Sequence, residues 1–452
     1  MSVIHAASAL TPDGWRADVL LSIEAGRFSA VEAGVAPSPR AHRCAIAVPG
    51  MANLHSHAFQ RGMAGHAEVR GQSPDSFWTW REWMYRFALT MTPDHVEAVA
   101  RQVYVEMLEA GFTRVGEFHY LHHDRDGRPY AAIAEMATRI AAAADEAGIG
   151  LTLLPVFYAH ANFGAQPATP GQRRFVSGLD GFARLLEGCR AAVDRLTGAN
   201  VGVAPHSLRA VAPEELAVVC AMAGDGPIHI HAAEQIREVE DCIAWSGAPP
   251  VAWLLNNAEV DARWCLIHAT HMTARETERL PRTGAIAGLC PVTEANLGDG
   301  VFNGPAFVGG GGRFGIGTDS NVRIGVADEL RQLEYAQRLF HRARNLMAVA
   351  GGSTGRALFD GALRGGAAAL RADGGGLAPG APANLVTLDA AHAGLAGCAG
   401  DDILDAWIFG AAKTAIDEVW VRGRRLVAGG RHCRRDEIGS RFRAVMDELG
   451  AA

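Results

Sequence analysis

Two histidines lie one residue apart at the end of an apolar run, in the segment PGMANLHSHAFQR at residues 49–61. Residues i and i+2 of a strand point to the same side, so His55 and His57 can converge on one ligand. Taken alone, such a pair is a structural feature about as often as a metal site. The residues that the rest of the chain brings to meet the pair therefore decide between the two readings.

Further residues able to do chemistry lie at the ends of later apolar runs. GPIHIHAAE carries His231 and Glu234, RWCLIHATH carries His268, and RFGIGTDSN carries Asp319. Imidazole nitrogens and carboxylate oxygens bind zinc, and a catalytic zinc keeps one position open for water. We therefore predict a metal centre with these four ligands: His55, His57, His231 and Asp319.

The elements that must position these residues are eight apolar, strand-like runs separated by segments long enough for helices. They cover residues 46–57, 113–120, 150–160, 199–209, 226–234, 263–271, 284–296 and 313–321. This alternation is typical of a (β/α)₈ TIM-like barrel. Because active sites of such barrels lie at the carboxyl ends of the strands, the polar residues that end these runs are expected to face one another.

Short strands and turns fill both ends of the chain. The first 48 residues show this strand-and-turn pattern, and the same pattern recurs in PANLVTLDA and DEVWVRGRRLVAGGRH. We predict an α/β fold in which a barrel at residues 49–375 carries a small β-sandwich domain. Residues 1–48 and 376–452 would build that second domain together.

Composition limits the classes of function. The 452 residues carry a net charge of −7, which argues against nucleic acid as the main partner. We expect no membrane partner, because no apolar stretch approaches the roughly 20 residues of a membrane span. No signal peptide is evident, and the eight cysteines form no CxxC pair, so we expect a cytoplasmic protein. The glycine-rich stretches at 309–312 and 374–376 lack the context of a phosphate-binding loop.

The ordered set PGMxNxHxH, HxxE, a strand-end histidine and GTDS resembles the amidohydrolase superfamily over nearly the whole chain. The HAAE form resembles its deaminase and deiminase branch. Binuclear members bridge two metals with a lysine at the end of the fourth strand, whereas Lys413 is the only lysine here and lies beyond the last ligand. The resemblance therefore implies a mononuclear site with one Zn²⁺ per subunit.

Six longer strings narrow the match: HSHAFQRGMAG, DSFWTWREWMYR, EFHYLHHD, PHSLRAV, HIHAAEQ and CPVTEANLGDG. Together they resemble the formimidoylglutamate deiminases, which hydrolyse N-formimino-L-glutamate to N-formyl-L-glutamate and ammonia in histidine degradation. The resemblance implies a homodimer and a small dianionic substrate. It implies the following substrate contacts, with Arg81 reaching in from the neighbouring subunit: Gln60, Arg81, Tyr120, His206 and Arg209.

The resemblance and the chemistry together imply three catalytic residues. Glu234 would carry protons between water and the leaving nitrogen, His268 would stabilise the developing charge, and Asp319 would accept the water's proton. Other histidines are expected to be structural: His119, His122, His123, His229 and His271.

Two alternatives remain open at this point. A mononuclear zinc deaminase of the same branch can act on a nucleobase or a related heterocycle. A metal-binding barrel without catalysis would need neither Glu234 nor His268. No motif indicates a redox or nucleotide-dependent enzyme.

Overall fold

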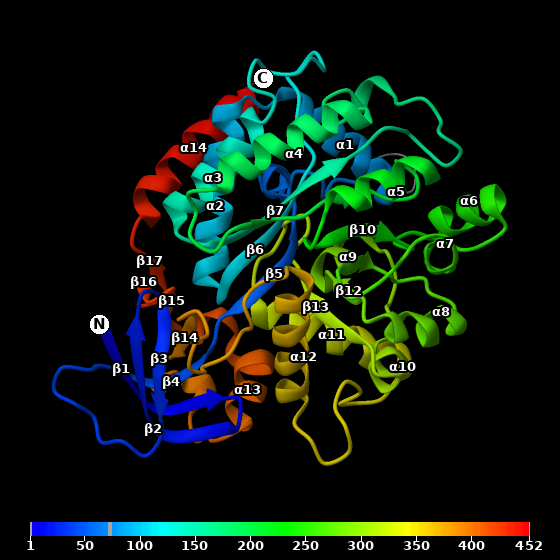
Figure 1. Cartoon of the computed structure of the whole chain (residues 1–452). Helices are drawn as coiled ribbons and strands as arrows, with labels where there is room; N and C mark the ends of the chain where they lie inside the picture. Colours follow the sequence, from blue (N-terminus) through cyan, green and yellow to red (C-terminus); the bar gives the residue numbers. More distant parts are fainter. Residues whose placement is uncertain (1, 71–74, 452) are drawn as a thin grey trace.

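Parallel strands form the centre of the molecule (Figure 1). The computed structural model describes residues 2–70 and 75–451. One sheet has the order β5-β6-β7-β8, with β9 paired to β7, and another has the order β10-β11-β12-β13. The bounds of these strands are β5 (Met51–Ser56), β6 (Phe112–His119), β7 (Gly150–Phe157), β8 (Asn200–Val201), β9 (Ala204–Pro205), β10 (Ile228–Ala232), β11 (Trp264–His268), β12 (Ile286–Leu289) and β13 (Arg313–Ile316).

Isolated bridges join the edges of the two sheets into a ring. Ser56 pairs with Asp319 beyond the end of β13, and Val203 and Ser207 pair with Ile228 and His231. All eight predicted runs supply strands of this ring, with the fourth run split into β8 and β9. The predicted α/β barrel is confirmed.

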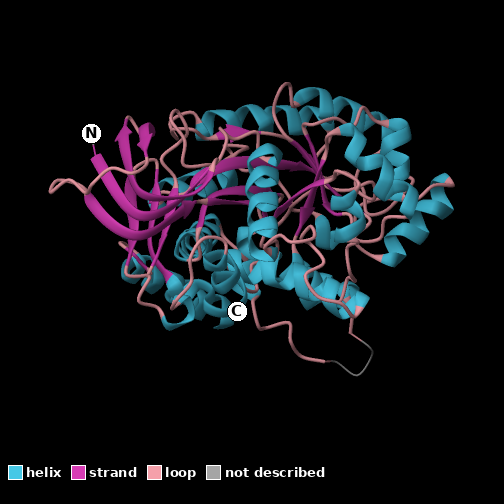
Figure 2. Cartoon of the chain, turned by 90° about the horizontal axis from the view of Figure 1, so that it is seen from below, coloured by secondary structure: helices cyan, strands magenta, loops and turns pink. Residues whose placement is uncertain are grey.

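Strands from both ends of the chain form a further sheet. It has eight strands in the order β17-β16-β15-β14-β4-β1-β2-β3, and only the β1–β4 pair is parallel. Figure 2 shows this sheet curving strongly, and it encloses a small apolar core that includes Leu21, Phe28 and Leu385. Where we expected a sandwich, the described residues form one continuous curved sheet. Its strands are β1 (Ser2–Thr11), β2 (Gly14–Glu24), β3 (Arg27–Glu32), β4 (His42–Pro49), β14 (Leu385–Leu388), β15 (Ile416–Val421), β16 (Arg424–Ala428) and β17 (Arg431–His432).

Helices surround the barrel, and α14 packs against α2 on the outer flank of the molecule (Figure 1). Local signals set helix ends; for example, Pro93 begins α2, and the hydroxyl of Thr92 accepts the His95 amide. The α-helices are α1 (Phe77–Thr90), α2 (Pro93–Glu109), α3 (Glu135–Ala147), α4 (Leu179–Val193), α5 (Pro213–Met222), α6 (Ile236–Ser246), α7 (Pro250–Asn257), α8 (Ala274–Arg279), α9 (Pro291–Leu297), α10 (Gly304–Gly309), α11 (Val326–His341), α12 (Thr354–Ala369), α13 (Asp402–Ala406) and α14 (Arg435–Ala451). Shorter helical turns are η1 (Ala58–Met63), η2 (Pro170–Gln172), η3 (Leu280–Thr283), η4 (Ala393–Leu395), η5 (Trp407–Ala411) and η6 (Ala412–Ala415).

Among the residues described, no helix is both long enough and apolar enough to span a bilayer. The predicted division at residues 48 and 375 stays a prediction.

Helix α12 packs closely on the barrel because glycines face the strands. A Cβ on Gly365 would lie 1.7 Å from the Phe314 carbonyl oxygen, and one on Gly315 would lie 2.7 Å from the Gly366 nitrogen. Backbone atoms of β13 cannot move aside without disturbing the strand that leads to Asp319. The spacing between α12 and β13 therefore depends on glycine.

We expect Gly365→Ala to lower the free energy of unfolding by about 3 kcal/mol, because the added methyl group overlaps a strand carbonyl. Differential scanning calorimetry would show this as a lower Tm. Gly309 is a matched control: it is also helical, but a Cβ there meets no atom within 4 Å, so Gly309→Ala should change stability by less than about 0.5 kcal/mol. An unchanged Tm for Gly365→Ala would contradict this account of the packing.

Candidate functional site

The end of β5 and the loop after β13 bring three predicted ligands together. His57 Nδ1 donates to the Phe118 carbonyl at 2.9 Å, which leaves its Nε2 facing Asp319. The Nε2 atoms of His57 and His55 lie 3.2 and 3.5 Å from Asp319 Oδ1. Two imidazoles and one carboxylate thus converge on one point.

His231 completes this cluster from the end of β10. Its Nδ1 donates to the His206 carbonyl at 2.9 Å, and its ring centre lies 4.9 Å from that of His55. One ligand atom from each of His55, His57, His231 and Asp319 lies within 4.8 Å of the others, and all four residues are buried. The structure therefore brings together the four residues that we predicted as ligands.

The chemistry of this donor set fits a divalent metal ion. The backbone carbonyls that accept from Nδ1 of His57 and His231 hold both rings in the tautomer that leaves Nε2 free to bind. Neither ring nitrogen of His55 has a hydrogen-bond partner among the described residues, although the side chain is fully buried. Such unpaired buried nitrogens are costly unless a ligand uses them.

The charges of these residues suit a cation as well. Burial lowers the pKa of His55 to about 3, and burial and the neighbouring histidines lower the pKa of His231 well below its usual range. Burial alone would raise the pKa of Asp319, but His55 and His57 outweigh this and lower it well below its ordinary value. Neutral imidazoles around an ionised carboxylate are the forms that coordinate zinc.

A buried amide network fixes the backbone at Asp319. The Asn321 side chain donates to the carbonyls of His57 and Asp319 and to the Ser56 hydroxyl. Asp319 and Asn321 have φ values of 45° and 56°, in the left-handed region. Because few residues adopt this conformation, the hydrogen bonds from Asn321 stabilise a turn that the chain would otherwise avoid.

Two more predicted residues lie next to the cluster. His268 Nε2 is 3.7 Å from Glu234 Oε1 and 3.8 Å from Asp319 Oδ2. Both carboxyl oxygens of Glu238 accept backbone amides at the turn after β10, from Ala233 at 3.2 Å and from Glu234 at 3.0 Å. Glu238 therefore holds the turn that presents Glu234.

These two residues differ in the direction of their pKa shifts. Burial raises the pKa of Glu234 above its ordinary value, and His268 and Arg209 offset part of that rise. Burial alone would lower the pKa of His268, but Glu234, Glu294 and Asp319 outweigh it and raise the pKa to about 10. A carboxyl that can gain and lose a proton thus faces a positively charged imidazole.

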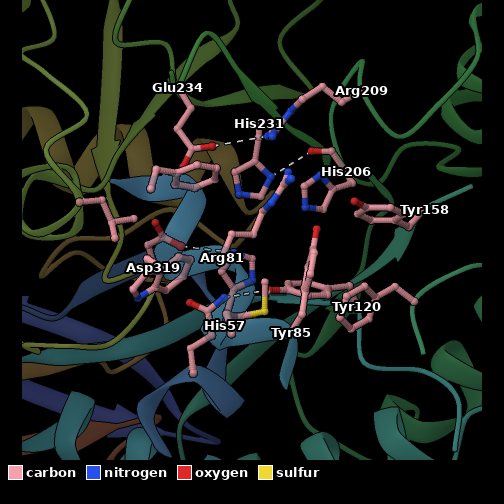
Figure 3. A pocket seen from close by; sticks show the side chains of 16 residues that line it. His57, Arg81, Tyr85, Tyr120, Tyr158, His206, Arg209, His231, Glu234 and Asp319 are labelled. Carbon is pink, nitrogen blue, oxygen red and sulfur yellow. Dashed lines mark hydrogen bonds and ion pairs between the residues drawn. The ribbon is translucent and has the colours of Figure 1, made fainter. Parts of the chain in front are cut away.

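A pocket opens above the cluster and encloses about 540 Å³, part of it open to solvent. Figure 3 shows the Arg81 and Arg209 side chains reaching into the same space. The Nε atoms of both arginines are buried and have no hydrogen-bond partner among the described residues. The other predicted contacts also line this pocket: Gln60, Tyr120 and His206.

Arg81 also lines this pocket. The structure places it over the pocket of its own chain, and the contribution of Arg81 to the neighbouring subunit's site stays a prediction. Its guanidinium carbon lies 4.6 Å from the ring centre of Trp78 and 5.5 Å from that of Tyr85, both on the same helix α1. Stacking on these rings orients the guanidinium group of Arg81 toward the pocket.

Sequence reasoning missed several residues of the site. Tyr158 lines the pocket at the end of the β7 run, so the rule about strand ends could have identified it. Glu294 accepts from His268 Nδ1 at 3.2 Å and lies in the CPVTEANLGDG string, but nothing in that string indicates its partner. Cys290 can form a second cluster with His268 and Asp319, yet burial and nearby carboxylates raise its thiol pKa well above the usual range.

Most histidines expected to be structural have backbone partners. In four of them the Nε2 atom donates to a backbone carbonyl. The pairs are His122 with Val156, His123 with Val176, His229 with Ala369, and His271 with Asp299. The remaining one, His119, is buried and packs edge-on against His122, with ring centres 5.3 Å apart.

Comparisons with known proteins place this arrangement in a family. The Amidohydrolase family matches residues 46–426, and the N-terminal domain of formimidoylglutamate deiminase HutF matches residues 1–44. The chain belongs to the amidohydrolase family. The formimidoylglutamate deiminase of Pseudomonas aeruginosa is 50% identical to it, over 99% of this chain and 100% of the relative. The predicted resemblance is thus confirmed.

Two solved structures resemble this amidohydrolase over its full length. An amidohydrolase from Brucella melitensis has 60% identity and a TM-score of 0.97, covering 99% of this chain and 100% of that one. An adenosine deaminase from Xanthomonas campestris with bound zinc has 20% identity and a TM-score of 0.81, covering 100% and 98%. At that identity the second likeness shows the fold alone.

The four-residue cluster is expected to bind a divalent metal ion. His231→Ala should therefore lose most of the metal that the purified amidohydrolase carries, because it removes one of the four buried ligands. Metal per chain can be measured by inductively coupled plasma mass spectrometry. His229→Asn is the control: His229 lies on the same strand, but its Nε2 donates to the Ala369 carbonyl, so this variant should keep its metal. Full metal in His231→Ala would contradict the assignment.

Proposed function

We propose that this amidohydrolase hydrolyses N-formimino-L-glutamate to N-formyl-L-glutamate and ammonia. The observation that carries the proposal is the pair of arginines, Arg81 and Arg209, whose buried Nε atoms have no partner in the part of the chain that the structure describes. The 50% identity to a formimidoylglutamate deiminase over the full chain supports the same substrate.

The pocket matches a small dianion. N-formimino-L-glutamate has two carboxylates, and the guanidinium groups of Arg81 and Arg209 can each pair with one of them. Gln60 donates from Nε2 to the Tyr120 hydroxyl at 2.8 Å, which leaves its buried Oε1 free for an N–H of the ligand. His206 is expected to stay neutral, because burial and nearby Arg209 lower its pKa well below the usual range. It can therefore accept or donate one hydrogen bond.

We assign His55, His57, His231 and Asp319 as ligands of one zinc ion per chain. When bound, zinc would acidify water and so supply a nucleophile at neutral pH. The donor set of three imidazoles and one carboxylate supports a mononuclear site.

The residues beside the cluster would move the protons. Glu234 Oε1 can take a proton from the attacking water and return it to the nitrogen that leaves as ammonia, and burial raises its pKa, which favours holding the proton between these two steps. His268 Nε2 faces the space between Glu234 and Asp319, where it can donate to charge that develops on the substrate. Asp319, whose pKa is held low, can accept a hydrogen bond from the water.

The same geometry disfavours a nucleobase or triazine ring as substrate. Such rings are flat and neutral, so they would leave Arg81 and Arg209 desolvated without a counter-charge. The positions of Glu234 and His268 beside the cluster also argue against a barrel that only binds metal, since binding needs neither group.

Three further proposals follow from the 50% identical formimidoylglutamate deiminase and from the sequence resemblance to that family. We propose a role in histidine degradation, a cytoplasmic location and a homodimeric state.

The substrate assignment predicts ammonia release by the zinc-loaded protein from N-formimino-L-glutamate, with guanine, adenosine and N-formimino-glycine inactive or much slower. Arg209→Ala should raise KM for the glutamate derivative about 100-fold, because a buried charge-assisted contact of 2–3 kcal/mol is lost. Arg338 stacks on Tyr335 and Phe409 outside the pocket, so Arg338→Ala is the control and should keep the wild-type KM. Ammonia from a nucleobase or nucleoside alone would overturn the assignment.

Glu234→Gln should lower kcat by about 10³-fold, because the amide cannot carry the proton. The variant should still bind the metal, since Glu234 lies outside the cluster of four. Steady-state kinetics and metal analysis of the same preparation check both statements. A kcat within tenfold of wild type would contradict the role of Glu234.

A further inference from the structure

His268 has a second carboxylate behind it, on the side away from the pocket. Glu294 Oε1 lies 3.2 Å from His268 Nδ1 and accepts its proton in a hydrogen bond. The side chains of Glu294 and His268 are 6% and 0% exposed, so water does not compete for this contact. The opposite ring nitrogen, Nε2, is buried without a hydrogen-bond partner among the described residues and faces Glu234 and Asp319.

Glu294 is itself held in place. It lies in the first turn of α9, and the same oxygen that accepts from His268 accepts the Cys290 amide at 2.8 Å. Helix α9 is fixed at its start by Glu329, whose Oε2 accepts the Val292 amide at 3.0 Å. The acceptor for His268 is thus anchored to a short helix rather than to a mobile loop.

The backbone at His268 makes such an anchor necessary. Its φ of 67° lies in the left-handed region, and Ala269 follows with a φ of 49°. The side chain therefore leaves the end of β11 from a turn, not from a regular strand, so strand geometry alone does not set the direction of the ring.

We propose that Glu294 is a positioning residue for the reaction. It accepts the Nδ1 proton of His268 in a hydrogen bond and fixes the plane of the ring, so that Nε2 points into the space where the substrate reacts. Carboxylates that orient metal-binding histidines in this way typically contribute about 10–100-fold to metal affinity or activity, and we expect an effect of the same order for a histidine beside the reacting atoms. The kinetic test of this inference rests on the proposed function, whereas its spectroscopic test does not.

A purely structural role is the competing explanation, because Glu294 also accepts the amide at the start of α9. Two variants separate the roles. Glu294→Ala removes both contacts. Glu294→Gln keeps the shape and a neutral oxygen for the Cys290 amide, but it offers His268 a weaker acceptor.

We expect kcat to fall about 100-fold in zinc-loaded Glu294→Ala and about tenfold in Glu294→Gln, with KM within twofold of wild type and an unchanged metal content. The matched control is Glu334→Gln. Glu334 is also fully buried and accepts backbone amides, from Leu346 and Met347, but it lies outside the pocket and should leave kcat unchanged.

The second readout does not need turnover. Long-range ¹H–¹⁵N spectra of the zinc-loaded protein labelled in histidine report the protonation and hydrogen bonding of each ring nitrogen, and a His268→Asn spectrum assigns the signals. We expect a protonated Nδ1 at His268 in the wild type and in Glu334→Gln. The signals should shift in Glu294→Gln and, if it folds, in Glu294→Ala.

Unchanged His268 ring signals in Glu294→Gln, or a wild-type kcat, would overturn the proposal. An equal loss of kcat in Glu334→Gln would also overturn it, because any buried carboxylate would then have the same effect. If the wild type releases no ammonia from N-formimino-L-glutamate, the proposed function fails, and the ring spectra alone decide the role of Glu294.

Discussion

The site depends on the backbone contact that closes the barrel between β5 and the loop after β13. The carbonyl of His55 accepts the amides of Thr318 and Asp319 at 3.1 and 3.0 Å, and the His57 amide donates to the Asp319 carbonyl at 2.9 Å. These hydrogen bonds fix the first strand of the barrel to the last. Because backbone atoms make the contact, it fixes the relative backbone positions of His55, His57 and Asp319, whichever rotamers their side chains adopt.

This closure leaves no room for ordinary side chains at its centre. A Cβ on Gly317 would lie 2.8 Å from the Cβ of His55, so only glycine allows the strands to approach. Asp319 then turns out of the strand with a positive φ, at a cost of about 1–3 kcal/mol for such a residue. Asn321 and Asn53 offset this cost: the Asn321 side chain binds the Asp319 carbonyl, and Asn53 Nδ2 donates to the Thr318 hydroxyl at 2.6 Å. The polar network is therefore part of how the barrel closes as well as part of the site.

Local rules explain how much of the fold and the site could be predicted from the sequence. Period-two alternation places His55 and His57 on one side of β5, and the strand ends of a barrel meet at one face, so the cluster of four followed from residue type and spacing. The strands near both termini could also be predicted, because short apolar runs separated by turns fill both ends of the chain. That these strands form one continuous curved sheet was not visible, because the order of strands within a sheet depends on contacts distant along the chain.

The missed features of the site have the same origin. Arg81 lies on helix α1 and not at the end of a barrel strand, so the strand-end rule does not place it. The direction of its side chain depends on stacking with Trp78 and Tyr85. The resemblance indicated that Arg81 contacts the substrate, but only packing shows which rings orient its guanidinium group. Glu294 was likewise part of a quoted string, yet its importance lies in a hydrogen bond to a residue on a different strand.

The balance of charge in the pocket supports the proposed binding of an anion. Burial alone would lower the pKa of Arg209, but the carboxylates of Glu238 and Glu234 outweigh it and raise the pKa, so the guanidinium stays charged in a buried position. Glu238 uses both oxygens on backbone amides, and Glu234 lies 3.6 Å from Arg209, beyond a good hydrogen bond. The buried Nε of this guanidinium thus has no hydrogen-bond partner in the part of the chain that the structure describes. A ligand carboxylate can pair with it and leave Glu234 free for proton transfer, whereas a neutral ring does neither. In the proposed function, recognition and proton transfer are therefore coupled through the same arginine.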